Sequence, residues 1–442
     1  MLDEFRAAAL RQRAWRSLRG VIKGCKLLLS QSGEMNGMGI SRDVVERLEE
    51  LDDEPLDGFF DYLARDLSPD PVAVLHSAQA YALTPNAAAL IALTLAVEPP
   101  RQELFRRLNR APGGTSALLH LRRQLHTRLP THPELLAIET DLLHLLSSWF
   151  NPGFLKMQRV DWNSPAQLLE KIIHHEAVHA IDGWDDLRRR LQPDRRCFAF
   201  FHPQLPEEPL IFVEVALLPE MPGAIAPLID KHSTPLPSER FRVAAFYSIS
   251  NCEPGLRGVS LGNFLIKSVA EQLRRELPRV RVFCTLSPMP RFAAWLLHEP
   301  AHEPAHGPGH KPAHGPRLEG ATVRKAHDTL MTLCDGDLSR LQAASLHDKL
   351  GDAGEHALLA LAAAYLVHVS ITPQGDPVAR FHLDNGAMLS RINLRGNMAA
   401  AGLKQSCGLM VNYLYHLEKI EASHARFRAG EVTRSREVAA LL

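Results

Sequence analysis

The sequence changes character near residue 150, and this change restricts the possible folds more than any other feature of the chain. Before it, apolar residues recur with the spacing of short amphipathic helices joined by polar turns. At Ser148–Gly153 the pattern is interrupted by Asn-Pro-Gly, which is typical of a turn. We therefore expect two domains, at residues 1–150 and 151–442 of this 442-residue chain.

The first domain carries several helix start signals. Asp70 precedes Pro71, which places a capping side chain before a proline at the first helical position. Thr84–Pro85 repeats this arrangement, and Thr131 with Glu134 fits a capping box. Short helices with short connections predict an all-α N-terminal helical bundle. No residue pattern here indicates catalysis, so we expect a packing or oligomerisation module.

The second domain alternates strand-like and helix-like segments. Leu210–Leu218 and Phe241–Ser250 are rich in β-branched and aromatic residues, which predicts strands. Val259–Leu277 has leucine and valine on one helical face, and Arg279–Ser287 alternates as a further strand. The order strand, strand, helix, strand favours an α/β (α+β) domain built on a central sheet.

Composition excludes several classes of function. Lys and Arg together number 50, as do Asp and Glu, so the net charge gives no support to a nucleic-acid or membrane-surface partner. No apolar run approaches the ~18 residues of a membrane span. The Arg- and Ala-rich N-terminus carries Asp3 and Glu4, which transit peptides avoid. The six scattered cysteines are typical of reduced thiols, so we expect a cytoplasmic protein.

Two histidine-rich segments raise the question of a metal. Within His298–Pro316 a histidine recurs every four residues with a proline two positions later, which excludes a helix and predicts a mobile extended loop. Such a loop has no fixed ligand geometry. His175, Glu176 and His179 form H-E-x-x-H, the pattern of zinc proteases when it lies on a helix. The charged segment after Asp182 offers no clear third ligand, so we expect no metal site.

Three long segments of the second domain resemble malonyl-CoA decarboxylase. They occur in the family's order and are far more specific together than any short motif. Glu176–His179 and Arg195–Cys197 also resemble the family, and the resemblance covers roughly residues 170–420. The three segments are Ser248–Lys267, Thr285–Leu296 with its Ser-Pro-Met-Pro, and Phe381–Tyr413 with its Phe-His-Leu-Asp-Asn-Gly.

The resemblance implies a catalytic domain with the fold of the Gcn5-related N-acetyltransferases, which has a mixed central sheet and binds an acyl-CoA. In that fold the loop between a strand and the next helix holds the CoA pyrophosphate. Backbone N–H groups and the helix dipole at such a position favour an anion, and glycines allow close approach. This sequence departs from the usual loop pattern because Ser260 replaces its first glycine. The expected CoA-binding residues are Arg257, Gly258, Val259, Ser260, Leu261, Gly262 and Asn263.

The family assigns catalysis to two residues whose local sequence is otherwise unremarkable. Ser287 follows a predicted strand, and a serine at a strand-end turn is common. His382 lies in a segment that alternates before Asn385–Gly386, which predicts a strand with the imidazole facing a cleft or water. The resemblance implies that Ser287 and His382 are catalytic, and we expect Tyr413 to support His382.

The implied activity is decarboxylation of malonyl-CoA to acetyl-CoA and CO2 through a stabilised thioester enolate. The thioester is itself the electron sink, so we expect no cofactor and no metal, and the family implies a homo-oligomer, as a dimer or tetramer. Three alternatives stay open. They are a CoA-dependent acyltransferase of the same fold, a zinc protease at His175 and His179, and a non-catalytic CoA-binding protein.

Overall fold

The computed structural model describes residues 2–30, 37–259, 261–298, 321–372 and 375–442, in two compact units. One unit contains residues 1–156, 202–208 and 253–260, and the other contains the rest of the chain. We call them the helical unit and the sheet unit. Most of the predicted His/Pro loop, residues 299–316, lies outside the described residues. Among the described helices, none is both long enough and apolar enough to cross a membrane.

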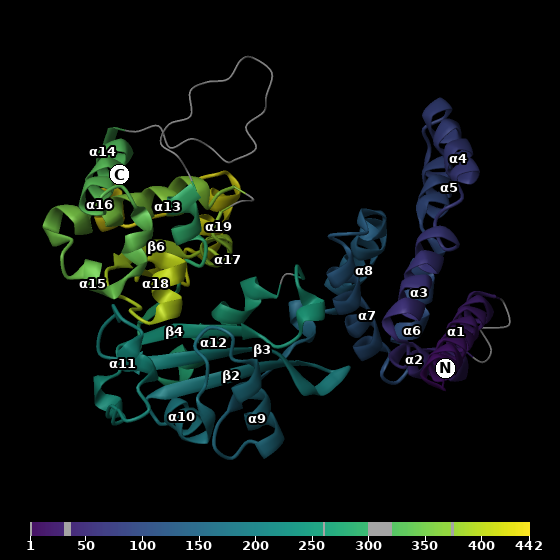
Figure 1. Cartoon of the computed structure of the whole chain (residues 1–442), viewed down its shortest axis with the longest axis horizontal. Coiled ribbons are helices and arrows are strands. Elements are labelled where there is room, and N and C mark those ends of the chain that lie inside the picture. Colours follow the sequence, from purple (N-terminus) through teal and green to yellow (C-terminus); the bar gives the residue numbers. More distant parts are fainter. Residues whose placement is uncertain (1, 31–36, 260, 299–320, 373–374) are drawn as a thin grey trace. The chain divides into compact units, whose positions relative to one another are not determined.

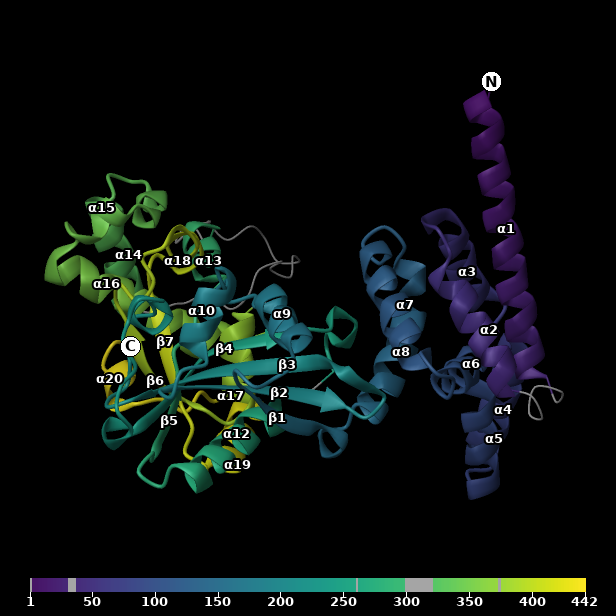
Figure 2. The same ribbon diagram turned by 90° about the horizontal axis from the view of Figure 1, so that it is seen from below.

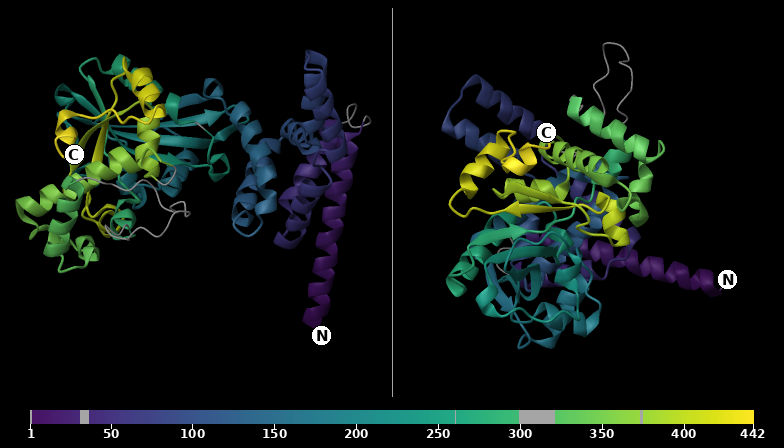
Figure 3. Two further views of the ribbon diagram at one scale, coloured as in Figure 1. Left: turned by 90° about the horizontal axis from the view of Figure 1, so that it is seen from above. Right: turned by 90° about the vertical axis from the view of Figure 1, so that its left-hand side faces the viewer.

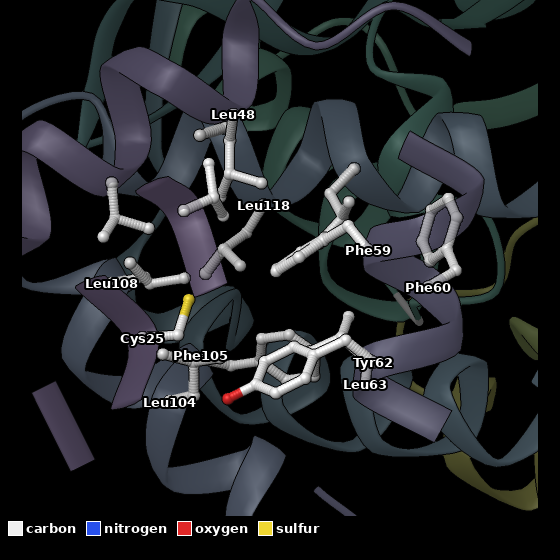
Figure 4. Close-up of a cluster of buried hydrophobic side chains, with 14 of the residues drawn as sticks. Cys25, Leu48, Phe59, Phe60, Tyr62, Leu63, Leu104, Phe105, Leu108 and Leu118 are labelled. Atoms are coloured by element: carbon white, nitrogen blue, oxygen red, sulfur yellow. The ribbon is translucent and has the colours of Figure 1, made fainter. Parts of the chain in front are cut away.

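The helical unit is built from eight helices of the described segments (Figure 1). Its apolar core holds Phe59, Phe60 and Phe105, which are all nearly inaccessible to solvent, together with many leucines (Figure 4). The helices are α1 (Leu2–Leu29), α2 (Gly37–Glu49), α3 (Asp53–Arg65), α4 (Pro71–Leu83), α5 (Ala87–Val97), α6 (Pro100–Asn109), α7 (Gly114–Arg128) and α8 (Leu136–Trp149).

The helix start signals are confirmed in one case and wrong in two. Asp70 accepts a hydrogen bond from the N–H of Val72 at 3.0 Å and begins α4, as predicted. Thr84 instead ends α4, and Asn86 begins α5 by accepting from the N–H of Ala89. No capping box forms at Thr131, because a 3-10 turn over Pro133–Leu135 precedes α8 and the Thr131 hydroxyl bonds back to the preceding helix.

Helices α4 and α5 lie side by side and form a hairpin with an unusual surface (Figure 1). Every residue of the two helices is described, and each is at least partly exposed to solvent. Among them Leu83, Ile91 and Leu95 are 84%, 59% and 67% exposed. An apolar face of this kind is typical of a surface that is covered by another protein chain.

The sheet unit contains a seven-stranded sheet in the order β1-β2-β3-β4-β5-β7-β6. The sheet is mixed, because β4 and β5 run parallel whereas β3–β4, β5–β7 and β6–β7 are antiparallel. The strands are β1 (Lys156–Val160), β2 (Arg195–His202), β3 (Leu205–Leu218), β4 (Val243–Asn251), β5 (Val282–Thr285), β6 (Met388–Asn393) and β7 (Met410–Leu414).

Helices cover both faces of this sheet. Figure 2 shows α9 and α10 on one side of the strands and α12 and α19 on the other, and Figure 3 shows α14 and α16 packed against each other. Alternate residues of β2, Cys197, Ala199 and Phe201, pack with Leu169 and Ile172 of α9 in one apolar cluster. The helices of the sheet unit are α9 (Ala166–His175), α10 (Gly183–Arg190), α11 (Ala226–Ile229), α12 (Gly262–Glu276), α13 (Phe292–His298), α14 (Ala321–Leu333), α15 (Ala344–His347), α16 (Gly351–Ala364), α17 (Pro377–Asp384), α18 (Ala400–Ser406), α19 (Ile420–Arg428) and α20 (Arg436–Ala439).

The predicted fold class is confirmed: an all-α region is followed by an α/β (α+β) unit with a mixed central sheet. The predicted strands at 210–218, 241–250 and 279–287 correspond to β3, β4 and β5. The predicted helix at 259–277 corresponds to α12, which begins three residues later, at Gly262. All six cysteines are buried, and none of them forms a disulfide bond.

Candidate active site

The candidate site lies where β5 and β7 separate. Their backbones pair at Cys284 and Leu414, and again at Ser287 and Val411, where both ladder hydrogen bonds measure 2.8 Å. Between these pairs the side chain of Thr285 replaces a backbone group, because its Oγ1 accepts from the N–H of Tyr413 at 3.2 Å. The gap brings side chains of both strands together on one face of the sheet.

Ser287 and His382 meet on this face, although 95 residues separate them in the sequence. The distance from Ser287 Oγ to His382 Nε2 is 3.0 Å, and Ser287 Oγ also donates to Thr285 Oγ1 at 2.9 Å. The backbone pairing of Ser287 with Val411 fixes the position of the serine, two residues after the end of β5. Both side chains are buried, with exposures of 5% and 3%. The two residues therefore form a hydrogen-bonded pair that is shielded from water.

Two tyrosines contact the imidazole in different ways: Tyr413 belongs to β7, and Tyr415 follows its last residue. The ring of Tyr413 stacks on that of His382, with centroids 4.8 Å apart and planes inclined by 27°. The hydroxyl of Tyr415 lies 2.8 Å from His382 Nδ1, so both ring nitrogens of His382 have hydrogen-bond partners. The hydroxyl of Tyr413 is buried and has no hydrogen-bond partner within the described part of the chain.

Helix α17 carries His382, which corrects the strand predicted there. Asp376 begins the helix by accepting from the N–H groups of Val378 and Ala379, and Pro377 occupies the first helical position. Gly386 adopts a positive φ of 76° just after the helix, so Asn-Gly ends a helix here and does not form a hairpin turn. The predicted exposure of the imidazole is also wrong, because the helix turns His382 into the interior.

Burial controls the ionisation of this site. It lowers the pKa of His382 from 6.5 to about 3, and no charged group is among the causes. Burial likewise raises the pKa values of Tyr413 and Tyr415 well above 10. The imidazole and both phenols are therefore neutral at physiological pH.

A network around Asn412 holds the separated strands in place. Its Nδ2 donates to the carbonyls of Thr285 and Pro222, at 2.7 and 3.0 Å. Its Oδ1 accepts from Arg391 Nε at 3.1 Å and from Asn393 Nδ2 at 2.9 Å. This fully buried amide thus uses two donors and two acceptor directions. Asn412 therefore supports the position of β5 just before Ser287.

The predicted CoA-binding run lies between the end of β4 and the start of α12, as expected. Residues 257–259 are part of the helical unit, and residues 261–263 are part of the sheet unit. The side chain of Arg257 is exposed, and Gly258 has a positive φ of 86°. Ser260 lies outside the described residues.

The H-E-x-x-H residues do not adopt the arrangement of a zinc protease. Helix α9 ends at His175, so the two histidines are not one helical turn apart. The carboxylate of Glu176 accepts from the hydroxyl of Ser248 and from the N–H groups of Val178 and His179. In the described segments, no group of three or more potential ligands is arranged to hold a metal ion.

Sequence reasoning missed Thr285 and Tyr415. The signal for Tyr415 was available, because residues two apart on a strand share a face and Tyr413 had been singled out. Thr285 stands in the same relation to Ser287. What the sequence does not contain is the separation of β5 from β7, which turns these neighbours into a cluster.

The mixed sheet between two layers of helices, with a buried Ser–His pair at the gap between two strands, defines the class as an α/β enzyme-like domain that follows an all-α region. Comparison with family models narrows this class. Residues 153–442 match the malonyl-CoA decarboxylase C-terminal domain, and residues 67–150 match the N-terminal domain of the same family. The chain belongs to the malonyl-CoA decarboxylase family.

Individual relatives agree with this assignment. The mitochondrial malonyl-CoA decarboxylase of Mus musculus is 37% identical over 338 residues, which cover 74% of this chain and 68% of that protein. The crystal structure of malonyl-CoA decarboxylase from Rhodopseudomonas palustris has a TM-score of 0.83 at 43% identity, and covers 96% of this chain and 99% of that chain. The Agrobacterium vitis structure has a TM-score of 0.82 at 44% identity, with 95% and 99% covered.

Proposed function

We propose that this protein decarboxylates malonyl-CoA to acetyl-CoA and CO2, with Ser287 and His382 as catalytic residues. Membership of the malonyl-CoA decarboxylase family supports the overall reaction. The observation that supports the two residues is their buried hydrogen bond of 3.0 Å, on the face where β5 and β7 separate.

The reaction breaks the bond between C2 and the carboxylate. Its electron pair moves into the thioester, where the carbonyl oxygen becomes an enolate oxygen, and CO2 leaves. The enolate then takes up a proton at C2, so one proton is consumed for each acetyl-CoA formed. Because the thioester accepts the electron pair, the chemistry requires no further electron sink and no metal. The protein must orient the carboxylate, provide hydrogen-bond donors and deliver the proton.

We assign the proton delivery to His382. Without substrate its imidazole is neutral, because burial lowers its pKa to about 3 and no carboxylate counteracts this. The malonyl carboxylate supplies a negative charge when it binds, and a nearby negative charge raises the pKa of an imidazole. His382 is then protonated together with substrate binding, and gives this proton to C2 after CO2 has left. Ser287 holds the substrate by its hydroxyl.

Tyr415 suits a histidine that changes its protonation state. A phenol can donate to Nδ1 of the neutral ring and accept from the N–H of the protonated ring. The 2.8 Å contact can therefore persist through the whole cycle. Tyr413 acts through its ring, because stacking at 4.8 Å fixes the plane of the imidazole. We place both tyrosines in the support of His382.

We also propose that Arg257, Gly258, Val259, Ser260, Leu261, Gly262 and Asn263 bind the pyrophosphate of CoA, as the family resemblance implies. The support from this chain is the position of the run, in the connection that follows β4 and leads into the start of α12. The exposed guanidinium of Arg257 can pair with a phosphate, and Gly258 adopts a backbone conformation that other residues disfavour.

The test measures products and variants together. Purified protein is incubated with malonyl-CoA, with and without EDTA, and the thioesters are followed by mass spectrometry. We expect acetyl-CoA at equal rates in both. Intact malonyl-CoA beside an active control enzyme would contradict the reaction, and transfer of the acyl group to an added amine would favour the acyltransferase. Loss of activity with EDTA would contradict the metal-free mechanism.

Matched variants test the residues. Ser287→Ala and His382→Gln are expected to fold and to lose most turnover. Ser406→Ala and His347→Gln are controls, because both side chains are as deeply buried and bond only to backbone carbonyls elsewhere. Near-normal kcat in Ser287→Ala or His382→Gln, or an equal loss in the controls, would refute the assignment.

A further inference from the structure

The first half of the predicted CoA-binding run is built onto the helical unit. Gly255, two residues before Arg257, packs against the backbone of α7. A Cβ at this position would lie 2.6 Å from the carbonyl oxygen of Leu119, which is too close for any other residue. Glu253 accepts from the N–H of Gly255 at 2.8 Å and fixes the start of the turn. The turn at Glu253–Gly255 therefore has a fixed position against α7.

One side chain of α7 holds this segment from the inside. Arg122 is fully buried, and its Nη1 donates to the carbonyl of Gly255 at 2.6 Å. Its Nη2 donates to the carbonyl of Arg257 at 2.7 Å. The two bonded residues are 133 and 135 positions away in the sequence. A single planar guanidinium thus spans two carbonyls of the turn, which a lysine ammonium cannot reproduce.

Glu139 of α8 neutralises and aligns this guanidinium. Its two carboxylate oxygens accept from Arg122 Nε at 2.9 Å and from Nη2 at 2.6 Å, which is the bidentate geometry. His126 Nε2 lies 3.1 Å from the same carboxylate. A buried guanidinium held by a bidentate carboxylate has one orientation. The two backbone carbonyls that accept from it are therefore held in one orientation as well.

The bond to Arg257 determines where the next N–H points. In a trans peptide the C=O and the N–H point in opposite directions, and the described residues contain no cis peptide. With the carbonyl of Arg257 turned toward Arg122, the N–H of Gly258 is turned away from it. The side chain of Arg257 is exposed. Arg122 therefore turns one potential anion-binding group of the run, the N–H of Gly258, away from its own guanidinium, and the exposed side chain of Arg257 offers a second such group.

We infer that Arg122, held by Glu139, is a positioning residue for the first part of the CoA-binding run, Arg257 and Gly258. The inference rests on the proposed role of Arg257–Asn263. It predicts that a change inside the helical bundle weakens the binding of CoA without altering the chemical step at Ser287 and His382.

The bundle offers a matched control. Arg101 of α6 is also buried and pairs with a carboxylate, with 2.5 Å from its Nε to Asp141 Oδ2. It also bonds to backbone carbonyls, those of Leu63 and Leu67. Arg101 has the chemistry of Arg122, but its hydrogen-bond partners lie within the bundle helices and their connections. Arg122→Lys and Arg101→Lys keep the positive charge but remove the planar guanidinium that donates several hydrogen bonds at once.

The experiment compares these two variants of the full chain with the unchanged protein. It measures the Kd for CoA by calorimetry, KM and kcat for malonyl-CoA, and Tm. We expect Arg122→Lys to raise Kd and KM about tenfold with kcat within about twofold. Arg101→Lys should lower Tm to a similar extent and leave Kd and KM unchanged. Glu139→Gln tests the same connection with a second side chain, should Arg122→Lys fail to fold.

Two results would overturn the inference. One is unchanged Kd and KM in folded Arg122→Lys and Glu139→Gln, and the other is an equal rise in Arg101→Lys. The proposed reaction is judged separately, by the unchanged protein. If that protein binds CoA but leaves malonyl-CoA intact, the reaction is refuted and the positioning role is still decided by Kd. If it does not bind CoA, both are refuted.

Discussion

The buried imidazole of His382 makes the stability of the sheet unit depend on pH. In the unfolded chain an ordinary histidine binds a proton near pH 6.5, whereas burial lowers the pKa of folded His382 to about 3. Between these values the unfolded state holds a proton that the folded state lacks. The contribution of the neutral imidazole is therefore fully present above pH 6.5, and it is lost progressively as the pH falls.

The size of this effect follows from the pH range between the two pKa values of His382. One pH unit corresponds to about 1.4 kcal/mol for one proton. When the pH falls from 7.5 to 4.5, two of the three units lie below the unfolded-state pKa of 6.5. His382 should therefore lower the free energy of unfolding by about 2.7 kcal/mol over this range. His179, whose pKa burial lowers to about 4, adds a similar loss. This loss from His179 occurs in the wild type and in variants of His382 alike, and therefore cancels when their free energies of unfolding are compared.

His382→Gln isolates the effect, because an amide of similar size does not titrate. Urea unfolding followed by tryptophan fluorescence at pH 7.5 and 4.5 gives the free energy of unfolding for each protein. Whatever the substitution costs at pH 7.5, the wild type should lose about 2.7 kcal/mol more than His382→Gln on acidification. Equal losses in the two proteins would show that folded His382 is protonated like an exposed histidine, and would refute the burial argument.

Three further predictions concern the support of the site and the helical hairpin. Tyr415→Phe removes the partner of His382 Nδ1 and should lower kcat by about tenfold, since one hydrogen bond of about 1.4 kcal/mol is lost; steady-state kinetics with unchanged kcat would contradict this role. Asn412→Leu removes four buried hydrogen bonds and should destabilise the protein by about 3 kcal/mol, measured by urea unfolding; a loss below about 1 kcal/mol would show that the network is dispensable. Replacing exposed Ile91 and Leu95 by Glu should reduce the mass measured by light scattering and leave turnover intact, because we propose that α4 and α5 mediate self-association as a dimer or tetramer; an unchanged mass would exclude this surface.

The order of elements was predictable from the sequence because it depends on local patterns. The strands rich in β-branched residues became β3, β4 and β5, and Asp70 with Pro71 began a helix as expected. The late start of α12 was not predictable from local sequence. Residues of the preceding turn are held by Arg122, more than 130 positions earlier, and no local propensity contains that contact.

The error at α17 has a different cause. Alternation over five residues is a weak signal, and Asp376 followed by Pro377 carries the same start signal that identified α4 correctly. Consistent use of that rule would have predicted a helix. The pairing of Ser287 with His382 came from the family resemblance, because nothing in either segment alone indicates that they meet. The spacing of Tyr415 from Tyr413 places both on one face, but its hydrogen bond to His382 depends on how β7 and α17 pack together.

The six buried cysteines make it possible to measure, by chemical labelling, how often each unit opens. Thiol reagents attack the thiolate, and burial raises the pKa of Cys25, Cys284 and Cys407 to about 12. The native chain should therefore react only when it opens. Cys25 belongs to the helical unit and the other five belong to the sheet unit. Mass-resolved labelling over time would thus time the opening of each unit separately, without any engineered probe.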